Sequence, residues 1–327
     1  MIILPILEFL SRCRLIAGIY HLVSDQPPIH IRHLYACKTR VQFERDIDFL
    51  LSRYKPIDIP QLTAYIRALE PLPKGFFLLT FDDGLRETYD AIAPILRRKG
   101  VPAVFFITTA FVDNLDMAYD HKISIIIERL LGSSPRMISR VSEILGKANL
   151  GSSECFQSLK RLTYVDRPLI EEIGMALDID FEAYRQKNHP YLSKDQILRL
   201  LSDGFYLGSH SIDHPAYKDI PLEEQLRQTV ESLSYLRSEF ELNYGLFAFP
   251  RTDGGVSSLF FEKLMQKKAV DITFGNSGLL DDSVSNHIQR MSFEKPLVPV
   301  ERSLRSQLAR RFHRRVNGNL IINHPSE

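Results

Sequence analysis

Tryptophan is absent from this chain of 327 residues, and cysteine is scarce. The three cysteines, Cys13, Cys37 and Cys155, form an odd set without the spacing of a metal site. Such a set argues against a disulfide framework and fits a reducing compartment. The chain also has no excess of either charge, because its formal net charge is +1. A strong electrostatic reason to bind nucleic acid is therefore missing.

A long hydrophobic run is missing as well. Residues 1–10 are apolar, but the run is short, contains Glu8 and has no basic segment before it. It is too short to span a bilayer and lacks the order of a secretory signal. We expect a helix that covers the core, with contact between residues 1–14 and a membrane surface as the alternative. The expected location is the cytoplasm, or the inner face of the membrane if that contact is made.

The remaining composition is that of an ordinary globular protein, with 44% hydrophobic and 25% charged residues, and we expect a single domain over residues 1–327. Strand and helix patterns alternate along it, which predicts an α/β fold with a parallel sheet, open or closed into a barrel. The expected strands are residues 15–23, 56–59, 76–81, 103–108, 205–210, 246–250 and 271–274. The expected helices are residues 41–54, 61–69, 86–98, 194–202, 221–240, 257–267 and 301–315.

Two segments depart from the alternation of this core, which covers about residues 15–300. Over about residues 112–190 the apolar pattern becomes purely helical, so we expect a helical insertion that caps the carboxyl edge of the sheet. We expect no separately folding domain there, because the stretch is short and thin in large apolar residues. Residues 301–327 form a basic helix and a tail; residues 310–315 are expected to be a solvated face and not a nucleic-acid site.

Two acids and a glycine follow the strand at residues 76–81. Asp82, Asp83 and Gly84 come directly after a run that reads as buried on both faces, and an amphipathic helix follows them. The carboxyl edge of a parallel sheet is where ligands and catalytic groups collect. The alternative is a polar turn with a helix cap, since Asp and Gly are common turn residues.

Two histidines occupy the same kind of position after a later strand. His210 and His214 lie four residues apart just past the strand at residues 205–210. Such a pair can bind one metal ion if the backbone there turns helically. Together with one carboxylate, two histidines make a three-ligand set that leaves positions open for water and substrate.

These two motifs, TFDDG at residues 80–84 and HSIDH at residues 210–214, resemble the first two motifs of the polysaccharide deacetylases, the NodB-homology domain of carbohydrate esterase family 4. Residues 247–253 (FAFPRTD) look like the third motif, with Arg251 and Thr252 in place of the more usual Tyr and Gly. The similarity runs from about Tyr20 to Arg290 and points to the poly-N-acetylglucosamine-type subgroup. It implies an incomplete (β/α) barrel, similar to a TIM barrel, that removes acetyl groups from N-acetylated sugars.

The resemblance also implies roles for individual residues. Asp83, His210 and His214 would hold a divalent metal ion, with Zn²⁺ as the expected one. Asp82 would be the general base, and the backbone N–H of Arg251, next to Pro250, would stabilise the oxyanion. The adjacency of the two acids argues against a glycosidase pair, whose carboxyl groups lie about 5–9.5 Å apart across the substrate.

Two histidines compete for the role of general acid. His21 lies in a stretch, Tyr20 to Val23, that resembles the first strand of the poly-N-acetylglucosamine-type enzymes. His324 resembles the family's late histidine, but it lies near the C-terminus in a composition typical of a loose end. We favour His21. Arg290 is expected to support the base, with a surface ion pair as the alternative.

Two functions from different classes follow from this pattern. The first is a metal-dependent hydrolase that acts on a glycan containing N-acetyl-hexosamine. The second is a catalytically inactive glycan-binding or scaffold protein that retains the fold. The presence of all three ligands, the base and an acid favours the hydrolase, because a decayed site would usually have lost at least one of them.

Overall fold

The computed structural model describes residues 3–147 and 150–326 and centres on a sheet of nine strands. Neighbouring strands follow the order β10-β1-β3-β4-β5-β6-β7-β9, with β2 paired to β3, and every pairing is parallel. The strands are β1 (Leu15–Tyr20), β2 (Lys55–Pro56), β3 (Phe76–Phe81), β4 (Ala103–Ile107), β5 (Tyr206–Ser209), β6 (Leu246–Ala248), β7 (Ile272–Gly275), β9 (His287–Gln289) and β10 (Met291–Ser292).

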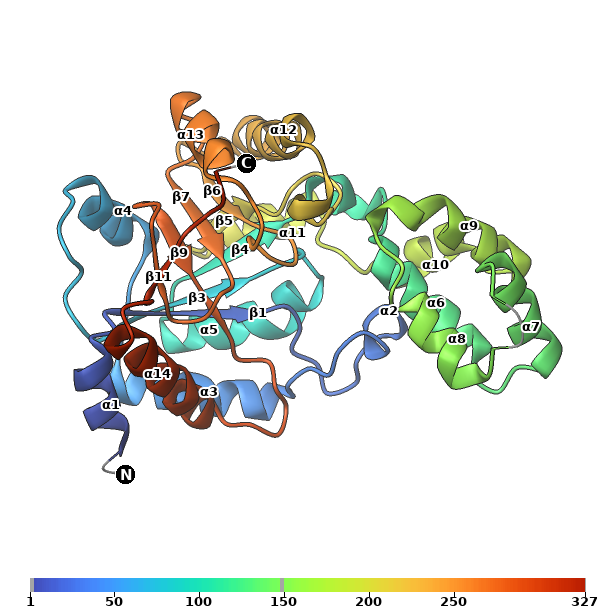
Figure 1. Cartoon of the computed structure of the whole chain (residues 1–327), viewed down its shortest axis with the longest axis horizontal. Coiled ribbons are helices and arrows are strands. Elements are labelled where there is room, and N and C mark those ends of the chain that lie inside the picture. The colour runs from blue at the N-terminus through green and yellow to red at the C-terminus, as the bar shows by residue number, and fades with distance from the viewer. Residues whose placement is uncertain (1–2, 148–149, 327) are drawn as a thin grey trace.

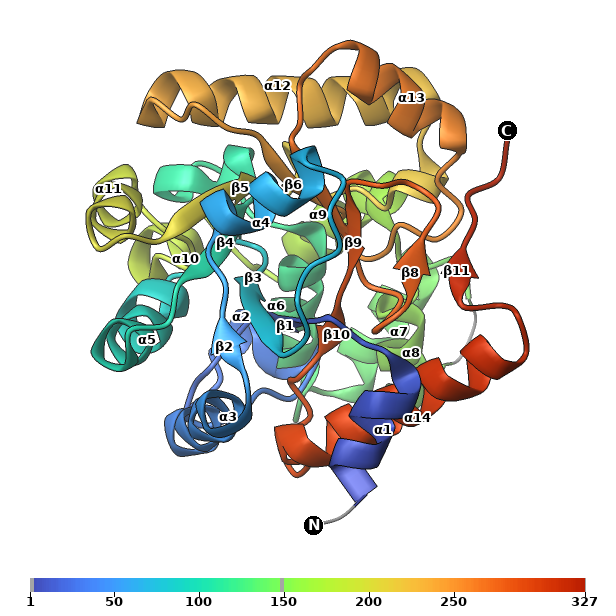
Figure 2. The same ribbon diagram turned by 90° about the vertical axis from the view of Figure 1, so that its left-hand side faces the viewer.

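The sheet nearly closes on itself. Its two outermost strands, β9 and β10, are consecutive in the chain and are separated only by Arg290. Figure 2 shows the helices arranged around this curved sheet. The expected incomplete (β/α) barrel is therefore confirmed. The helices of the barrel are α3 (Arg40–Arg53), α4 (Ile59–Arg67), α5 (Ala93–Lys99), α11 (Lys194–Ser202), α12 (Leu222–Phe240) and α13 (Ser258–Gln266). The short helix α2 (Ile29–Arg32) packs against the insertion instead.

The central strand β3 shows why the sheet is buried on both faces. Phe77, Leu79 and Phe81 join the cluster of apolar side chains that includes residues of α3, α5 and α11. Leu78 points the other way, into a second cluster that includes Leu62 of α4. Successive side chains of a strand alternate between its faces, so an unbroken apolar run places both faces in a core. The two carboxylates after β3 are thereby placed at the carboxyl edge.

The insertion between β4 and α11 forms a lobe of five helices within the described residues: α6 (Tyr119–Leu130), α7 (Pro135–Ile144), α8 (Ser152–Leu159), α9 (Arg167–Ala176) and α10 (Phe181–Asn188). Figure 1 shows the lobe beside the barrel, on the side toward which β1 points. The expectation that this stretch is thin in large apolar residues is wrong, because it has a buried cluster that includes Ile126 and Ile173. The cluster also takes in Leu22 and Leu85 of the barrel edge. Whether the chain divides into domains stays a prediction.

The two ends of the chain pack against the barrel. Helix α1 (Ile3–Ser11) contacts α14 (Val300–Val316), and Leu4 is buried in the main core. Phe9 is 72% exposed on the same helix, and contact of this helix with a membrane stays a prediction. In the part of the chain that the structure describes, every helix is too short or too polar to cross a bilayer. Near the other end, β11 (Ile321–Ile322) pairs in parallel with β8 (Asp281–Asp282).

Candidate active site

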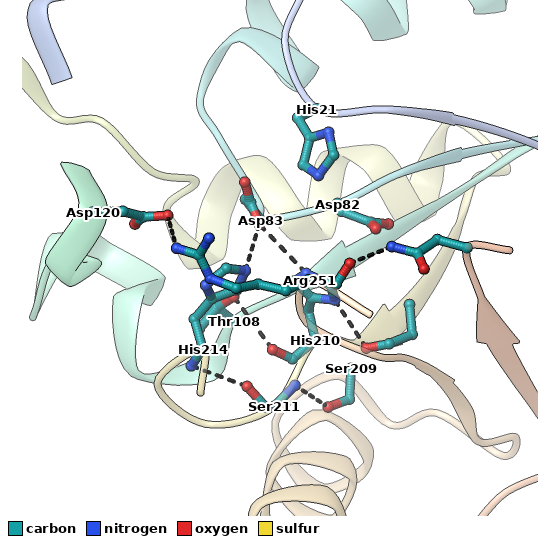
Figure 3. A network of polar contacts seen from close by, with 12 residues as sticks. His21, Asp82, Asp83, Thr108, Asp120, Ser209, His210, Ser211, His214 and Arg251 are labelled. Carbon is teal, nitrogen blue, oxygen red and sulfur yellow. Dashed lines mark hydrogen bonds and ion pairs between the residues drawn. The ribbon is translucent and has the colours of Figure 1, made fainter. Parts of the chain in front are cut away.

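The three expected metal ligands, Asp83, His210 and His214, meet at the carboxyl edge of the barrel. Oδ1 of Asp83 lies 3.4 Å from Nε2 of His210 and 3.2 Å from Nε2 of His214, as Figure 3 shows. Ligand atoms of a tetrahedral zinc ion, with bonds of about 2.0–2.2 Å, lie about 3.3 Å from one another. No side chain of the three is more than 10% exposed. The spacing therefore matches a single divalent ion.

Two candidate ligand atoms of this cluster are unpaired within the described residues. Among the described residues, Asp83 Oδ1 and His210 Nε2 are buried without a hydrogen-bond partner. The ring of His210 is turned by its Nδ1, which lies 2.9 Å from the carbonyl oxygen of Ala248. That oxygen only accepts, so Nδ1 carries the hydrogen and Nε2 presents its lone pair. Leaving such buried atoms unpaired costs free energy, and a bound cation removes this cost. The residues therefore fit a divalent metal ion.

The two histidines come together without a helical turn, so the condition set for a histidine pair at this spacing is not needed here. Ser211 and His214 have φ values of 70° and 66°, and Asp83 has a φ of 72°. Non-glycine residues in this left-handed region cost about 1–3 kcal/mol each, and such residues cluster at functional sites. The turn is held by the hydroxyl of Ser211, which accepts a hydrogen bond of 3.0 Å from the amide of His214.

Asp82 points away from the metal ligands and pairs with Arg290. The guanidinium donates to both carboxylate oxygens, at 2.7 and 2.9 Å, and also to Thr80 Oγ1 at 2.9 Å. Arg290 is 1% exposed, so the alternative of a surface ion pair is wrong. Burial favours the protonated acid, but the charge of Arg290 outweighs burial and holds the pKa of Asp82 below its usual range. Asp82 is therefore ionised at neutral pH.

His21 follows the last residue of β1 and is oriented by Glu294. Its Nδ1 lies 2.9 Å from Oε2 of Glu294, whose Oε1 accepts a 2.6 Å hydrogen bond from the amide of His21. Burial lowers the pKa of His21, but the carboxylates of Glu294 and Asp83 outweigh it and raise the pKa to about 10. The imidazole is therefore held protonated, and its Nε2–H is available to donate a proton. In Figure 3, His21 lies on the opposite side of Asp83 from His210 and His214.

A cavity of about 420 Å³ is lined by some of these groups, although Asp82 and His210 are not among its lining residues. The barrel contributes His21, Asp83 and His214 to its lining, and the insertion contributes Asp120 and Lys160. This volume is in the usual range for a ligand site. A larger cavity of about 870 Å³ lies beside α14 but contains none of these side chains. The chemistry of the lining, and not the volume, identifies the site.

Comparison with known sequences decides the family. The sequence model described as polysaccharide deacetylase matches residues 70–270, which is more than half of the chain. The chain belongs to the polysaccharide deacetylase family. The poly-β-1,6-N-acetyl-D-glucosamine N-deacetylase of Escherichia coli strain K12 is 24% identical to this deacetylase-family chain over 241 residues. That alignment covers 73% of this chain but 30% of the relative, so the chain spans less than a third of that protein's length.

Solved structures agree with the fold of this family member. The deacetylase PplD of Streptococcus pyogenes, solved in complex with acetate, superposes with a TM-score of 0.57 at 13% identity. That match covers 90% of this chain and 98% of the other. IcaB from Ammonifex degensii has a TM-score of 0.56 at 15% identity, with 90% and 97% of the two chains covered. At these identities the likeness extends to the fold alone.

Arg251, which departs from the usual third motif, brings the insertion and the barrel of this family member together. It follows Pro250 with a φ of 59°, and its guanidinium donates a 2.8 Å hydrogen bond to Asp120 of α6. Within the described part of the chain, its amide N–H has no hydrogen-bond partner, as an oxyanion donor requires. The side chain of Arg251 thus contacts the insertion, while its amide N–H stays available as a hydrogen-bond donor.

His324 lies outside this site. Its ring is 4.4 Å from that of Phe261, centroid to centroid, and Nε2 lies 3.1 Å from Oδ1 of Asp282. The side chain is 2% exposed, so the expectation of a loose end is wrong here. The pairing of β11 with β8 fastens this segment to the fold.

Sequence reasoning missed three residues of the site. Glu294 and Asp120 orient His21 and Arg251, and Tyr35 lines the cavity with a buried hydroxyl that has no partner among the described residues. None of the three belongs to a motif after a long strand. Glu294 follows the two-residue strand β10, and Tyr35 lies in the loop between α2 and α3. No local pattern in the sequence indicates these positions.

Proposed function

We propose that this deacetylase-family protein is a divalent-metal-dependent N-deacetylase that removes acetyl groups from N-acetylglucosamine residues of a glycan. The observation that carries the proposal is the buried set of Asp83, His210 and His214, with ligand atoms at the spacing of one ion. Family membership supports the reaction type. The name of the Escherichia coli relative, a poly-β-1,6-N-acetyl-D-glucosamine N-deacetylase, supports the substrate class.

The residues around the ligand set divide the chemistry of amide hydrolysis. A divalent ion held by Asp83, His210 and His214, expected to be Zn²⁺, supplies Lewis-acid polarisation and an activated water. Asp82, kept ionised by Arg290, accepts the proton of the attacking water. The amide N–H of Arg251 donates to the oxygen that becomes negative as the carbonyl carbon turns tetrahedral.

The leaving amine needs a proton before the carbon–nitrogen bond breaks. His21 carries one, because Glu294 bonds to Nδ1 and stabilises the imidazolium. A donor on the opposite side of Asp83 from the two ligand histidines can reach the amide nitrogen while Asp82 serves the water. The sum of the steps is one amide and one water converted to an amine and acetic acid. One proton has then moved from His21 to Asp82, and its return to His21 restores the site.

The test is release of acetate from N-acetylglucosamine oligosaccharides. The wild-type protein loaded with Zn²⁺ should release acetate, and His214→Ala should release none above the uncatalysed background. His313→Ala is the matched control, because His313 is exposed on α14 and should leave the rate unchanged. Oligosaccharide binding by the wild type without acetate release would overturn the proposal in favour of a glycan-binding protein. Wild-type rates in His214→Ala would overturn the ligand assignment.

A further inference from the structure

A second cluster of aspartate and histidine lies outside the active-site cavity. Asp253, Asp282, His287 and His324 each present a ligand atom, and these atoms all lie within 4.8 Å of one another. The four residues come from separate segments: the loop after β6, the end of β8, the start of β9 and the stretch after β11. None of the four side chains is more than 2% exposed.

The distances within this cluster are those of a coordination shell. Nε2 of His287 lies 3.2 Å from Oδ2 of Asp253 and 4.0 Å from Oδ2 of Asp282. Nε2 of His324 lies 3.1 Å from Oδ1 of Asp282. Ligand atoms around a tetrahedral zinc ion are about 3.3 Å apart, and imidazole nitrogen and carboxylate oxygen are both ordinary zinc ligands. Four protein ligands would complete such a shell.

Hydrogen bonds to neighbouring groups orient the two histidines of the cluster in the way that is usual for metal ligands. Nδ1 of His324 lies 3.2 Å from the carbonyl oxygen of Val256, and Nδ1 of His287 lies 2.7 Å from the hydroxyl of Thr273. A carbonyl oxygen only accepts, so the hydrogen of neutral His324 sits on Nδ1 and Nε2 presents a lone pair to the cluster. Bonds of this kind from the second ring nitrogen accompany metal-ligating histidines.

The two carboxylates are held in the same way. The side-chain amide of Gln289 donates to Oδ2 of Asp253 at 2.6 Å and to Oδ2 of Asp282 at 2.9 Å. Its own oxygen accepts a 2.7 Å hydrogen bond from the amide of Ser277, which fixes which end of the side chain faces the acids. Each carboxylate is thus pinned from outside the cluster, with lone pairs left toward the histidines.

The charge of the cluster points to a cation. Over residues 3–147 and 150–326, no lysine or arginine forms an ion pair with Asp253 or Asp282. By contrast, Asp82, the buried acid of the active site, forms an ion pair with Arg290. Two buried carboxylates without a permanent cation are costly, and one divalent ion would neutralise both. A cavity of about 470 Å³ has Asp282 and His287 among its lining residues.

We propose that Asp253, Asp282, His287 and His324 bind a divalent cation, with Zn²⁺ as the ion that this ligand set suits. Bound there, the ion joins the paired strands β8 and β11 to β9 and to the loop after β6. Its role is to fasten the C-terminal segment to the barrel, because four protein ligands leave no position open for substrate. The proposal does not depend on the deacetylase reaction.

The first test is the zinc content of protein dialysed against metal-free buffer, measured by elemental analysis. The wild type should hold two equivalents, and His214→Ala and Asp282→Asn should each hold one. The double variant should hold none. His313→Gln, an exposed histidine on α14, is the matched control and should retain two. Circular dichroism checks that each variant is folded, and His287→Gln replaces Asp282→Asn if the latter is not.

The second test measures metal binding at the new cluster alone, through the thermal stability of the His214→Ala variant. A chelator should lower the Tm of this variant and added Zn²⁺ should restore it, because an ion that binds only the folded state stabilises it. Adding Asp282→Asn should abolish this response.

Three outcomes separate the possibilities. A folded His214→Ala protein without zinc, or a wild type with one equivalent that His214→Ala removes, would overturn the proposal and leave a hydrogen-bonded network only. Unchanged zinc in both Asp282→Asn and His287→Gln would overturn it too. One wild-type equivalent that survives His214→Ala and is lost in Asp282→Asn would uphold this cluster and overturn the metal site of the proposed function instead.

Discussion

The two clusters of aspartate and histidine differ in their surroundings. Around Asp83, the backbone at three positions is left-handed, two ligand atoms have no hydrogen-bond partner among the described residues, and a cavity lined by the insertion lies alongside. None of the four described residues of the second cluster has a positive φ, and outside groups such as Gln289 and Val256 hold them in place. Strain and open positions suit catalysis, whereas a closed shell of four suits a structural ion.

The neighbouring charges differ as well. The active-site cluster has two charged pairs near it, Asp82 with Arg290 and His21 with Glu294, so a base and an acid accompany the ligands. The second cluster has only amide, hydroxyl and carbonyl partners. Turnover should therefore be lost when residues around the first cluster are changed, and not when residues of the second cluster are changed. Each variant below tests this difference between the two clusters.

The largest effect is expected from Asp82→Asn. Without a general base the turnover should fall by roughly 10²–10⁴-fold, while both clusters keep their zinc. The change also leaves Arg290 buried without its counter-charge, which costs about 3–5 kcal/mol of stability. Turnover is therefore measured per folded molecule, alongside metal content. Loss of zinc together with activity would show that Asp82 is a ligand and not the base.

The second prediction separates the two histidines that compete as general acid. His21→Gln should lower kcat by about 10²-fold or more and leave zinc and Tm close to wild type. His324→Gln should do the reverse, lowering Tm and zinc content by one equivalent, with far less effect on kcat. Steady-state kinetics and thermal melts of both variants check this. A strong kcat defect confined to His324→Gln would assign the acid to the late histidine and break the division between the clusters.

The third prediction concerns pH. His21 acts when protonated, so the rate is full below its pKa and is lost as the pH rises through it; in the free protein that pKa is raised to about 10. A bound dication lowers the value, whereas Glu294 raises it. Glu294→Gln should therefore move the basic limb of kcat/KM to lower pH, by roughly 1–3 units.

Glu301→Gln is the control for the pH experiment. Glu301 pairs with Arg305 on α14, far along the chain from β1, and its replacement should leave the profile unchanged. An unmoved basic limb in Glu294→Gln would mean that another group supplies the proton.

The sequence predicted the barrel and the first cluster because both depend on local pattern. Asp83 and His210 each follow an unbroken apolar strand, and the carboxyl ends of parallel strands meet at one edge. The second cluster could not be found this way. Asp282 and His287 belong to strands of two and three residues without an apolar run of their own, and His324 reaches them only through the pairing of β11 with β8.

The backbone of the first cluster also escaped prediction. Two histidines four apart suggest a helical face, but Ser211 and His214 are left-handed, a conformation that propensity disfavours. The core of the insertion was underestimated for a related reason. Its buried isoleucines lie on three separate helices, α6, α7 and α9, and only tertiary packing gathers them into one cluster.

The smallest effect is expected at the cavity, where the insertion meets the barrel. Removing the whole insertion would expose the apolar cluster shared with Leu22 and Leu85, so a point change is the sharper probe. Lys160, at the end of α8, lines the cavity that Asp83 faces. We expect its stem and charge to contact bound sugar equally before and during the reaction, and such uniform binding changes KM without changing kcat.

Lys160→Ala should therefore raise KM about two- to tenfold, a loss of roughly 0.4–1.4 kcal/mol of binding, with kcat and both zinc ions retained. Lys187→Ala, an exposed lysine of α10 in the same lobe that does not line the cavity, is the matched control and should match the wild type. Equal kinetics for the two variants on every oligosaccharide would mean that the insertion does not contact the substrate. The open cavity would then no longer distinguish the first cluster from the second.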